Sequence, residues 1–258
     1  MGIGKTLRSI SIVGLKNFIR LKSEDYRKVL RVKIEDREIF LRARTTDLSV
    51  AIDSLTDEYE HLSGLLPSSF SGLIVDAGAY IGTASVRLSE LYPMATIVAI
   101  EPSSLNFSVL KMNTERNKNI HLVKAALSTR SGEIVDLIDP GDREWGFKVS
   151  TESDPAVESG CIIEKVRTVT LLDIVEDYGD SIGILKLDIE GAEVALFELA
   201  SDILSSIPII IVELHERIVP GSLRSFENFS KNREVVEGKG EKFLSIARGQ
   251  SRGGGRSR

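Results

Sequence analysis

The sequence predicts an α/β fold with a doubly wound, mainly parallel sheet, and three observations support this prediction. From Gly72 onward, short apolar runs alternate with amphipathic segments, which is the pattern of parallel strands joined by crossover helices. Several runs are apolar at almost every position, as expected for strands that helices cover on both faces. A glycine turn over residues 78–82 joins the first run to the first helical pattern, as in doubly wound folds.

The individual elements of the sheet follow from this alternation. The predicted strands are residues 72–76, 95–101, 120–126, 184–189 and 208–214. The predicted helices are residues 83–92, 104–117, 171–178 and 192–204. Pro93 ends the first helix because its ring cannot continue the backbone hydrogen bonding. Two later runs, residues 233–237 and 243–247, flank Gly238-Lys239-Gly240 and predict a C-terminal antiparallel hairpin.

Residues 1–70 precede the alternating pattern and are predicted to form an N-terminal extension of helix and β-hairpin. Period-two runs at 30–34 and 39–43 predict the hairpin, and Asp47 is predicted to cap the helix that follows it. Residues 1–24 carry one helical apolar stripe with basic residues around it. Two interpretations stay open for this helix: contact with an anionic membrane surface, and packing on the domain or on a partner subunit.

The remaining residues, 71–248, are assigned to one ligand-binding domain, and the Gly-, Ser- and Arg-rich residues 249–258 to a disordered tail. Within the domain, residues 127–170 are longer than a crossover requires. Strand-like runs at 132–137, 145–150 and 166–170, with a turn at Pro140-Gly141, predict a β insertion near the mouth of the site. Trp145 in this insertion either forms an apolar wall for the substrate or packs within the insertion.

Composition excludes several classes of protein. The 258 residues suit one sizeable domain, and a net charge of −5 argues against non-specific nucleic-acid binding. A single cysteine, Cys161, excludes an intrachain disulfide and a cysteine-based zinc site. No run approaches the roughly 18 apolar residues of a membrane span, and no signal-peptide pattern is present. We therefore expect a cytoplasmic protein.

The turn after the first predicted strand is the strongest indication of a ligand. Gly78 permits a sharp turn and close approach of a ligand, and the following helix offers it free N–H groups. Glu101 follows Gly78 by 23 residues, at the end of the next strand, where doubly wound folds place an acid against ribose hydroxyls. The sequence thus predicts a nucleoside-containing cofactor.

The glycine spacing discriminates between such cofactors. A dinucleotide site has three glycines in G-x-G-x-x-G spacing, whereas this chain has Asp76-x-Gly78-x-x-x-Gly82. A carboxylate at Asp76 repels a pyrophosphate and favours a cation, such as the amino and sulfonium groups of S-adenosylmethionine.

Three segments resemble the FkbM family of S-adenosylmethionine-dependent methyltransferases. They are residues 75–82, the Ala99-Ile100-Glu101-Pro102 corner and the run Leu185-Lys186-Leu187-Asp188-Ile189-Glu190-Gly191-Ala192-Glu193. The strand end Val212-Glu213-Leu214-His215-Glu216 fits as well, and the resemblance covers residues 32–247. It implies a class I, Rossmann-like methyltransferase fold and O-methylation, often of sugar or polyketide hydroxyls.

The cofactor should then lie along the first three strand ends. We expect Asp76 and Gly78 to hold its methionine part and Glu101 to hold its ribose hydroxyls. Adenine is expected beside residues 124–126, although this chain lacks the acid that many relatives of the fold carry there. The expected cofactor-binding residues are Asp76, Ala77, Gly78, Ala79, Tyr80, Gly82, Glu101, Pro102, Ser103, Ala125, Ala126 and Asp188. The substrate wall is expected from residues 25–70 and 127–170.

The expected catalytic residues are Asp188, Glu190, Glu213 and His215, because ligands bind beyond the carboxyl ends of parallel strands. Alternation along each strand end puts Asp188 with Glu190, and Glu213 with His215. Two roles stay open: binding of a divalent metal that lowers the pKa of a substrate hydroxyl, and direct general-base catalysis by His215. Lys186, within the strand, is expected to neutralise a neighbouring carboxylate.

Three functions are compared. The favoured one is an S-adenosylmethionine-dependent O-methyltransferase for a small-molecule or glycan (sugar) acceptor, without a nucleic-acid partner. A nicotinamide-dependent oxidoreductase or epimerase is disfavoured by the missing third glycine and by Asp76. A non-catalytic partner subunit with the methyltransferase fold stays open, because a cofactor pocket is compatible with lost chemistry. The sequence makes no prediction of acceptor identity, metal dependence or oligomeric state.

Overall fold

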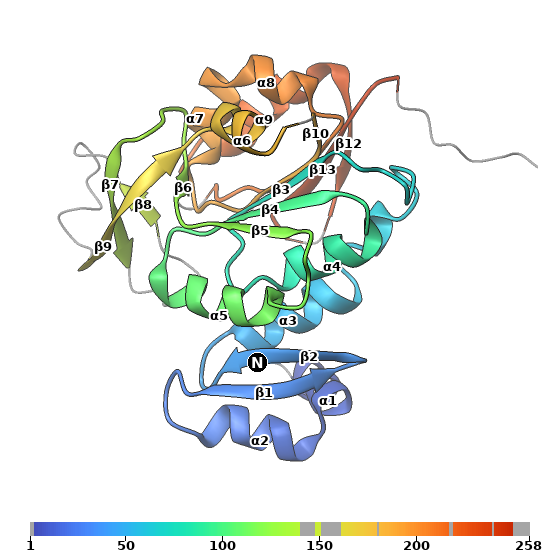
Figure 1. The fold of residues 1–258 in the computed structure, drawn as a ribbon, viewed down its shortest axis with the longest axis vertical. Helices are drawn as coiled ribbons and strands as arrows, with labels where there is room; N and C mark the ends of the chain where they lie inside the picture. The colour runs from blue at the N-terminus through green and yellow to red at the C-terminus, as the bar shows by residue number, and fades with distance from the viewer. Residues whose placement is uncertain are drawn as a thin grey trace, which may run out of the picture.

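A seven-stranded sheet forms the centre of the protein in a computed structural model that describes residues 3–139, 148–150, 161–179, 181–216, 219–238 and 240–249. The strand order is β12-β13-β11-β10-β3-β4-β5 (Figure 1). The strands are β3 (Leu73–Ala77), β4 (Thr96–Ile100), β5 (Ile120–Val123), β10 (Ile182–Leu187), β11 (Ile209–Glu213), β12 (Arg233–Glu237) and β13 (Lys242–Ala247). Within this sheet, β13 runs in the direction opposite to the other six strands. This mainly parallel order with a C-terminal antiparallel hairpin confirms the predicted class I methyltransferase fold.

Helices cover both faces of this sheet because its strands are apolar on both sides (Figure 1). Along β3, Leu73 and Val75 pack on one face, whereas Ile74 packs on the other. The first face is covered by α6 (Leu171–Tyr178), α7 (Glu193–Leu199), α8 (Ser201–Ser206) and α9 (Ser222–Phe229). The opposite side carries α3 (Asp47–Thr56), α4 (Thr83–Leu91) and α5 (Ser104–Thr114). Short 3₁₀ helices span Glu60–Leu62 and Ser230–Asn232.

The predicted helix at 192–204 is wrong in one respect, because it is two helices. Ala200 between α7 and α8 has φ −115° and ψ 24°, outside helical geometry. The other predicted crossover helices are confirmed, and the strand predicted at 120–126 ends earlier, at Val123. Beyond Val123 the chain leaves the central sheet, since Ala126 and Leu127 pair with another strand.

The N-terminal elements pack below α3, α4 and α5 (Figure 1). The predicted hairpin is present as β1 (Val29–Ile34) and β2 (Arg37–Arg42). The single helix predicted over residues 1–24 is wrong: α1 (Ile3–Val13) and α2 (Leu15–Ser23) are separated at Gly14, which has φ 80°. The extension shares one apolar cluster with α4 and α5, through Val86 and Val109. A domain boundary near residue 70 and a membrane contact of residues 1–24 stay predictions.

The β insertion forms a second sheet of order β6-β9-β7-β8. Its strands are β6 (Ala126–Leu127), β7 (Ile134–Asp139), β8 (Lys148–Ser150) and β9 (Cys161–Val169). The Pro140-Gly141 turn, Trp145 and residues 250–258 of the predicted tail lie outside the described residues. Among the residues that the structure describes, none of the helices is long and apolar enough to cross a membrane.

Candidate active site

A cavity of about 500 Å³ opens at the carboxyl ends of β3, β4, β10 and β11. That volume lies in the range of about 300–1,000 Å³ that is usual for small-molecule sites. The position is the topological switch point of the sheet. After β3 the chain adds β4 and β5 on one side of it, and then adds β10 and β11 on the other side. Predicted site residues on its wall are Gly78, Ala79, Tyr80, Glu101, Pro102, Ala126, Asp188, Glu190, Glu213 and His215.

Gly78 begins the turn after β3, with φ 77°, in the left-handed region that favours glycine. Its N–H and that of Ala79 both donate to the carbonyl of Ile100, which ties the turn to the end of β4. A Cβ at position 78 would lie 1.7 Å from the carbonyl oxygen of Asp188. The turn after β3 and the loop after β10 therefore approach closely only because residue 78 has no side chain.

Glu101 follows β4 and is 4 % exposed, with its carboxylate on the cavity wall. Its Oε2 accepts a hydrogen bond from the Tyr80 N–H at 2.9 Å, and its Oε1 accepts one from the Ser103 N–H at 2.9 Å. Asn106 Nδ2 donates to Oε1 at 3.2 Å. Burial raises the pKa of Glu101 to about 7, against the effect of these three donors, which favour the ionised form.

The N-terminal extension supports Glu101 from behind. Arg42 at the end of β2 donates to Asn106 Oδ1 at 2.9 Å, so one amide connects the hairpin to Glu101. Arg42 is itself held by two hydrogen bonds to the Asp47 carboxylate, both 2.9 Å long, and both side chains are buried. Tyr80 lies over the Arg42 guanidinium and donates its hydroxyl to Asp47 at 2.7 Å. Burial raises the pKa of Tyr80 well above its usual value, so its hydroxyl stays protonated.

Asp76 lies beneath the cavity and does not line it. It is 0 % exposed, and its Oδ1 lies 3.1 Å from Lys186 Nζ, while Ser85 Oγ donates to its Oδ2 at 2.5 Å. Asp76 and Lys186 face each other on the neighbouring strands β3 and β10. The cation that Asp76 meets is therefore Lys186, and direct contact with a cofactor would require Lys186 to move. Lys186 also lies 3.5 Å from Asp188 Oδ2, which confirms that it neutralises neighbouring carboxylates.

The other predicted cofactor residues divide into two groups. Pro102 and Ala126 are on the cavity wall, whereas Ala77, Gly82, Ser103 and Ala125 are buried behind it. Gly82 serves helix packing: a Cβ there would lie 2.5 Å from Leu110 Cδ1 of α5. Ser103 caps α5, because its side chain accepts a hydrogen bond from the Asn106 N–H.

Asp188, Glu190 and His215 come together at the ends of β10 and β11. His215 Nε2 lies 3.3 Å from Glu190 Oε2 and 3.7 Å from Asp188 Oδ1. On the other side of the ring, Nδ1 lies 3.1 Å from Glu193 Oε1. Strand alternation does not produce this grouping, since Asp188, Glu190 and His215 all lie beyond the last residues of their strands.

Glu190 and His215 of this group have strongly shifted pKa values. Burial raises the pKa of Glu190 to about 8. Burial acts to lower the pKa of His215, but its hydrogen bond to Glu193 and the nearby carboxylates outweigh it and raise that pKa to about 9. Burial likewise raises the pKa of Glu213. Clustered groups with such shifts are typical of functional sites.

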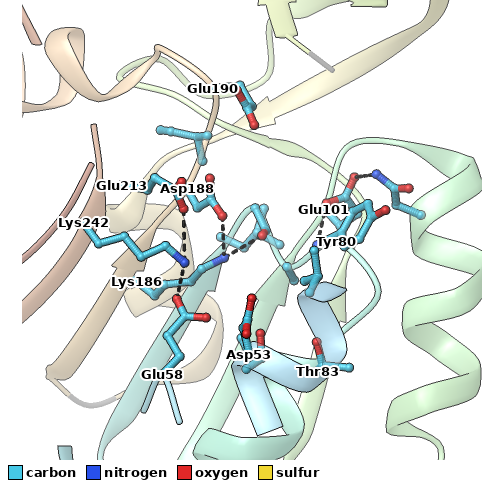
Figure 2. A pocket seen from close by; sticks show the side chains of 18 of the residues that line it. Asp53, Glu58, Tyr80, Thr83, Glu101, Lys186, Asp188, Glu190, Glu213 and Lys242 are labelled. Carbon is cyan, nitrogen blue, oxygen red and sulfur yellow. Dashed lines mark hydrogen bonds and ion pairs between the residues drawn. The ribbon is translucent and has the colours of Figure 1, made fainter. Parts of the chain in front are cut away.

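Glu213 has a different partner from the one predicted. Its Oε2 lies 3.4 Å from Lys242 Nζ, and Lys242 Nζ also lies 2.5 Å from Glu58 Oε1. Figure 2 shows Lys242 between Glu58 and Glu213, with Lys186 beside Asp188. Lys242 comes from β13, so the antiparallel strand supplies a cation to the cavity wall.

Residue-level prediction missed two parts of the site. One cavity wall is built by α3 and the residues on either side of it, through Thr46, Ser49, Val50, Asp53, Ser54, Glu58 and Tyr59. These residues lie within the predicted substrate wall at 25–70, but their sequence has no recognisable binding motif. The second is Glu193 at the start of α7, which was not among the predicted site residues. Within residues 127–170, Leu127 is the described residue on the wall.

Parts of this chain are similar in sequence to known methyltransferases. The chain is 28 % identical over 170 residues to Methyltransferase sdnD of Sordaria araneosa, which covers 55 % of this chain and 64 % of the relative. It is also 28 % identical over 148 residues to Hexuronic acid methyltransferase AglP of Haloferax volcanii, covering 56 % of each. The chain thus spans less than two thirds of the length of either relative.

A crystal structure of Methyltransferase FkbM from Methylobacillus flagellatus aligns over 71 % of this chain and 45 % of its own, with 18 % identity and a TM-score of 0.43. The fold assignment accordingly rests on the strand order given above. A family model described as the Methyltransferase FkbM domain matches residues 76–237, more than half of the chain. The chain therefore belongs to the FkbM methyltransferase-domain family.

Proposed function

We propose that this protein is an S-adenosylmethionine-dependent methyltransferase that acts on a hydroxyl of a small molecule or glycan. The observation that carries the proposal is the Glu101 carboxylate, which faces a cavity at the topological switch point beside the glycine turn at Gly78. The FkbM family supports methyl transfer, and similarity to a hexuronic acid methyltransferase supports a sugar acceptor.

The cavity wall fits the parts of the cofactor. Glu101 offers two carboxylate oxygens, held in place by backbone donors, to vicinal ribose hydroxyls. The turn from Gly78 to Tyr80 gives close backbone approach for the methionine part, because residue 78 has no Cβ. Ala126 and Leu127 form an apolar surface for the adenine. The acids on the wall suit the cationic sulfonium and amino groups, although Asp76 is not among them.

The residues of the chain have two tasks in the transfer. Bound S-adenosylmethionine supplies an electrophilic methyl group and a leaving group that departs without charge. The cavity wall must hold the acceptor hydroxyl in line with that methyl group, and a polar group must take up the hydroxyl proton. Asp188, Glu190 and His215 are the groups that we assign to the hydroxyl, since they lie together on the wall at the ends of β10 and β11.

Calorimetric titration of the purified protein with S-adenosylmethionine, S-adenosylhomocysteine and NAD tests the cofactor. We expect micromolar binding of the first two and none of NAD. Binding of NAD alone, or of none of the three, would contradict the proposal. Mass spectrometry with neutral sugars, hexuronic acids and phenols then tests the acceptor, and cofactor binding without any methylated product would favour the non-catalytic subunit.

A further inference from the structure

We propose that Asp188, Glu190 and His215 bind one divalent metal ion at the wall of the cavity. One ligand atom from each lies within 4.8 Å of the other two. His215 Nε2 is 3.3 Å from Glu190 Oε2 and 3.7 Å from Asp188 Oδ1. Atoms that bind one ion at about 2.1 Å lie roughly 3–4 Å apart, and both distances from His215 Nε2 fall in this range.

Glu193 holds the imidazole in the orientation that this site needs. Its side chain is 0 % exposed, and its Oε1 is fixed by the Ile189 N–H at 3.1 Å and by His215 Nδ1 at 3.1 Å. A carboxylate accepts only, so His215 donates from Nδ1, and Nε2 is the nitrogen that faces Asp188 and Glu190. A metal ion between the three would replace the proton that Nε2 carries in the imidazolium form, and a carboxylate behind a metal-binding histidine is the usual arrangement.

Glu190 is a second, independent indication of a bound cation. Its side chain is only 9 % exposed, and Oε2 has no hydrogen-bond partner among the residues that the structure describes. This oxygen is the one that faces His215 Nε2. A buried carboxylate oxygen without a donor is costly unless a cation is nearby.

The charges around the site favour the same conclusion. Carboxylates gather around this part of the cavity, from Glu58, Asp188, Glu190 and Glu213 on its wall and from Asp76 and Glu193 behind it. Within the described part of the chain, two ammonium groups compensate them. Lys186 lies against Asp76 and Asp188 Oδ2, and Lys242 lies between Glu58 and Glu213 (Figure 2). Neither has an ion pair with Glu190, so His215 Nε2 is the cationic group that faces it, and a metal ion at this point would take the place of the imidazolium proton.

The ligand set indicates the kind of ion. One imidazole and two carboxylates suit a first-row divalent ion such as Mn²⁺ or Zn²⁺, and three protein ligands leave positions for water or a substrate oxygen. Asp188 Oδ2 stays with Lys186 while Oδ1 faces the ion, which keeps the carboxylate in place. The catalytic use of the ion, which is to lower the pKa of the acceptor hydroxyl, rests on the proposed function. The proposal that the three residues bind a metal ion is independent of that function.

Direct metal binding is the test. Chelator-treated protein is titrated with MnCl₂ while the electron paramagnetic resonance signal of free Mn²⁺ is followed, and ZnCl₂ and MgCl₂ are used as competitors. We expect one Mn²⁺ per chain with micromolar affinity. Glu190→Gln and His215→Gln should each weaken binding at least tenfold, and Glu193→Gln should weaken it about 10- to 100-fold.

Matched controls are available in the same chain. His121→Gln and Glu227→Gln change an exposed histidine and an exposed glutamate away from the cavity and should bind Mn²⁺ like the parent protein. Absence of Mn²⁺ and Zn²⁺ binding, or equal affinity in the parent and in Glu190→Gln, would overturn the metal site. Titration of the same preparations with S-adenosylmethionine separates the two proposals. Metal binding without cofactor binding would contradict the proposed function but not the metal site. Cofactor binding without metal binding would contradict the metal site but not the proposed function.

Discussion

A side chain at Gly78 would place its Cβ 1.7 Å from the backbone carbonyl oxygen of Asp188, so the turn after β3 lies directly against the loop after β10. This contact brings the proposed cofactor turn and the proposed metal ligand together. Asp188 also donates its N–H to the Ala77 carbonyl at 3.1 Å, which extends the ladder between β3 and β10 by one bond. The spacing between the two halves of the site is therefore set by a backbone contact.

Gly78→Ala should separate these two loops. Alanine in the left-handed backbone conformation loses about 1–2 kcal/mol of folding stability. The backbone shift that avoids the clash with the Asp188 carbonyl costs about 1–3 kcal/mol more. Denaturant unfolding should show a stability loss of this size, and calorimetry should show cofactor affinity reduced at least tenfold. Gly64→Ala is the control, because Gly64 has φ 88° with nothing within 4 Å of a built Cβ. Equal losses in both variants would show that the contact with Asp188 is unimportant.

Glu101→Gln should weaken the binding of S-adenosylmethionine by a factor of ten or more. The substitution keeps the shape but removes a charged acceptor, and hydrogen bonds to charged groups contribute about 1.5–3 kcal/mol. Calorimetric titration measures the change, with unfolding curves to verify the fold. Unchanged affinity would remove Glu101 from the ribose site.

Cofactor affinity should also depend on pH through Glu101. Its pKa is raised to about 7 in the folded protein, and ribose hydroxyls donate best to the ionised carboxylate. Binding should therefore tighten about tenfold from pH 6 to pH 8 and release a proton, which calorimetry in buffers of different ionisation enthalpy detects. The Glu101→Gln variant should lose most of this dependence. An equally steep profile in that variant would assign the titration to another group.

The stability of the unliganded protein should change in the opposite direction. A carboxyl whose folded pKa is raised stabilises the fold below its unfolded pKa, and this stabilisation is lost as pH rises through about 7. Glu101→Gln should therefore be more stable than the parent at pH 8, by up to about 3 kcal/mol, and similar to it near pH 4. Urea unfolding at the two pH values measures the difference, and a constant difference would contradict the raised pKa.

Asn106→Ala should show that the N-terminal hairpin supports the cofactor site. The Asn106 amide connects Arg42 to Glu101, so its loss removes a donor from Glu101 Oε1. We expect cofactor affinity to fall about three- to tenfold, in line with about 1 kcal/mol for one hydrogen bond. Asn113→Ala is the matched control, since Asn113 is a buried amide on the same helix that bonds Phe40 and Ile81 instead. Equal affinity losses in both variants would indicate a general effect of α5.

The sheet was predictable because its signals are local. Both faces of the central strands are covered, so runs such as residues 209–212 are apolar throughout, and the turn at Gly78 stands between a strand and a helix. The helix breaks at Gly14 and Ala200 were not predicted, since the apolar pattern continues across both. Glu101 could be proposed as a ribose ligand from the sequence because doubly wound sheets place an acid at the end of this strand against ribose hydroxyls.

The sequence by itself determined the order of strands and helices, the glycine turn and the acid after β4, because each depends on neighbours in the chain. The tertiary structure decided which partners the charged groups have. Strand pairing sets Asp76 beside Lys186, and the loops after β10 and β11 set His215 between Glu193 and Glu190. Such partners lie far apart in the sequence, so only the folded sheet, in which burial demands a counter-charge, selects them.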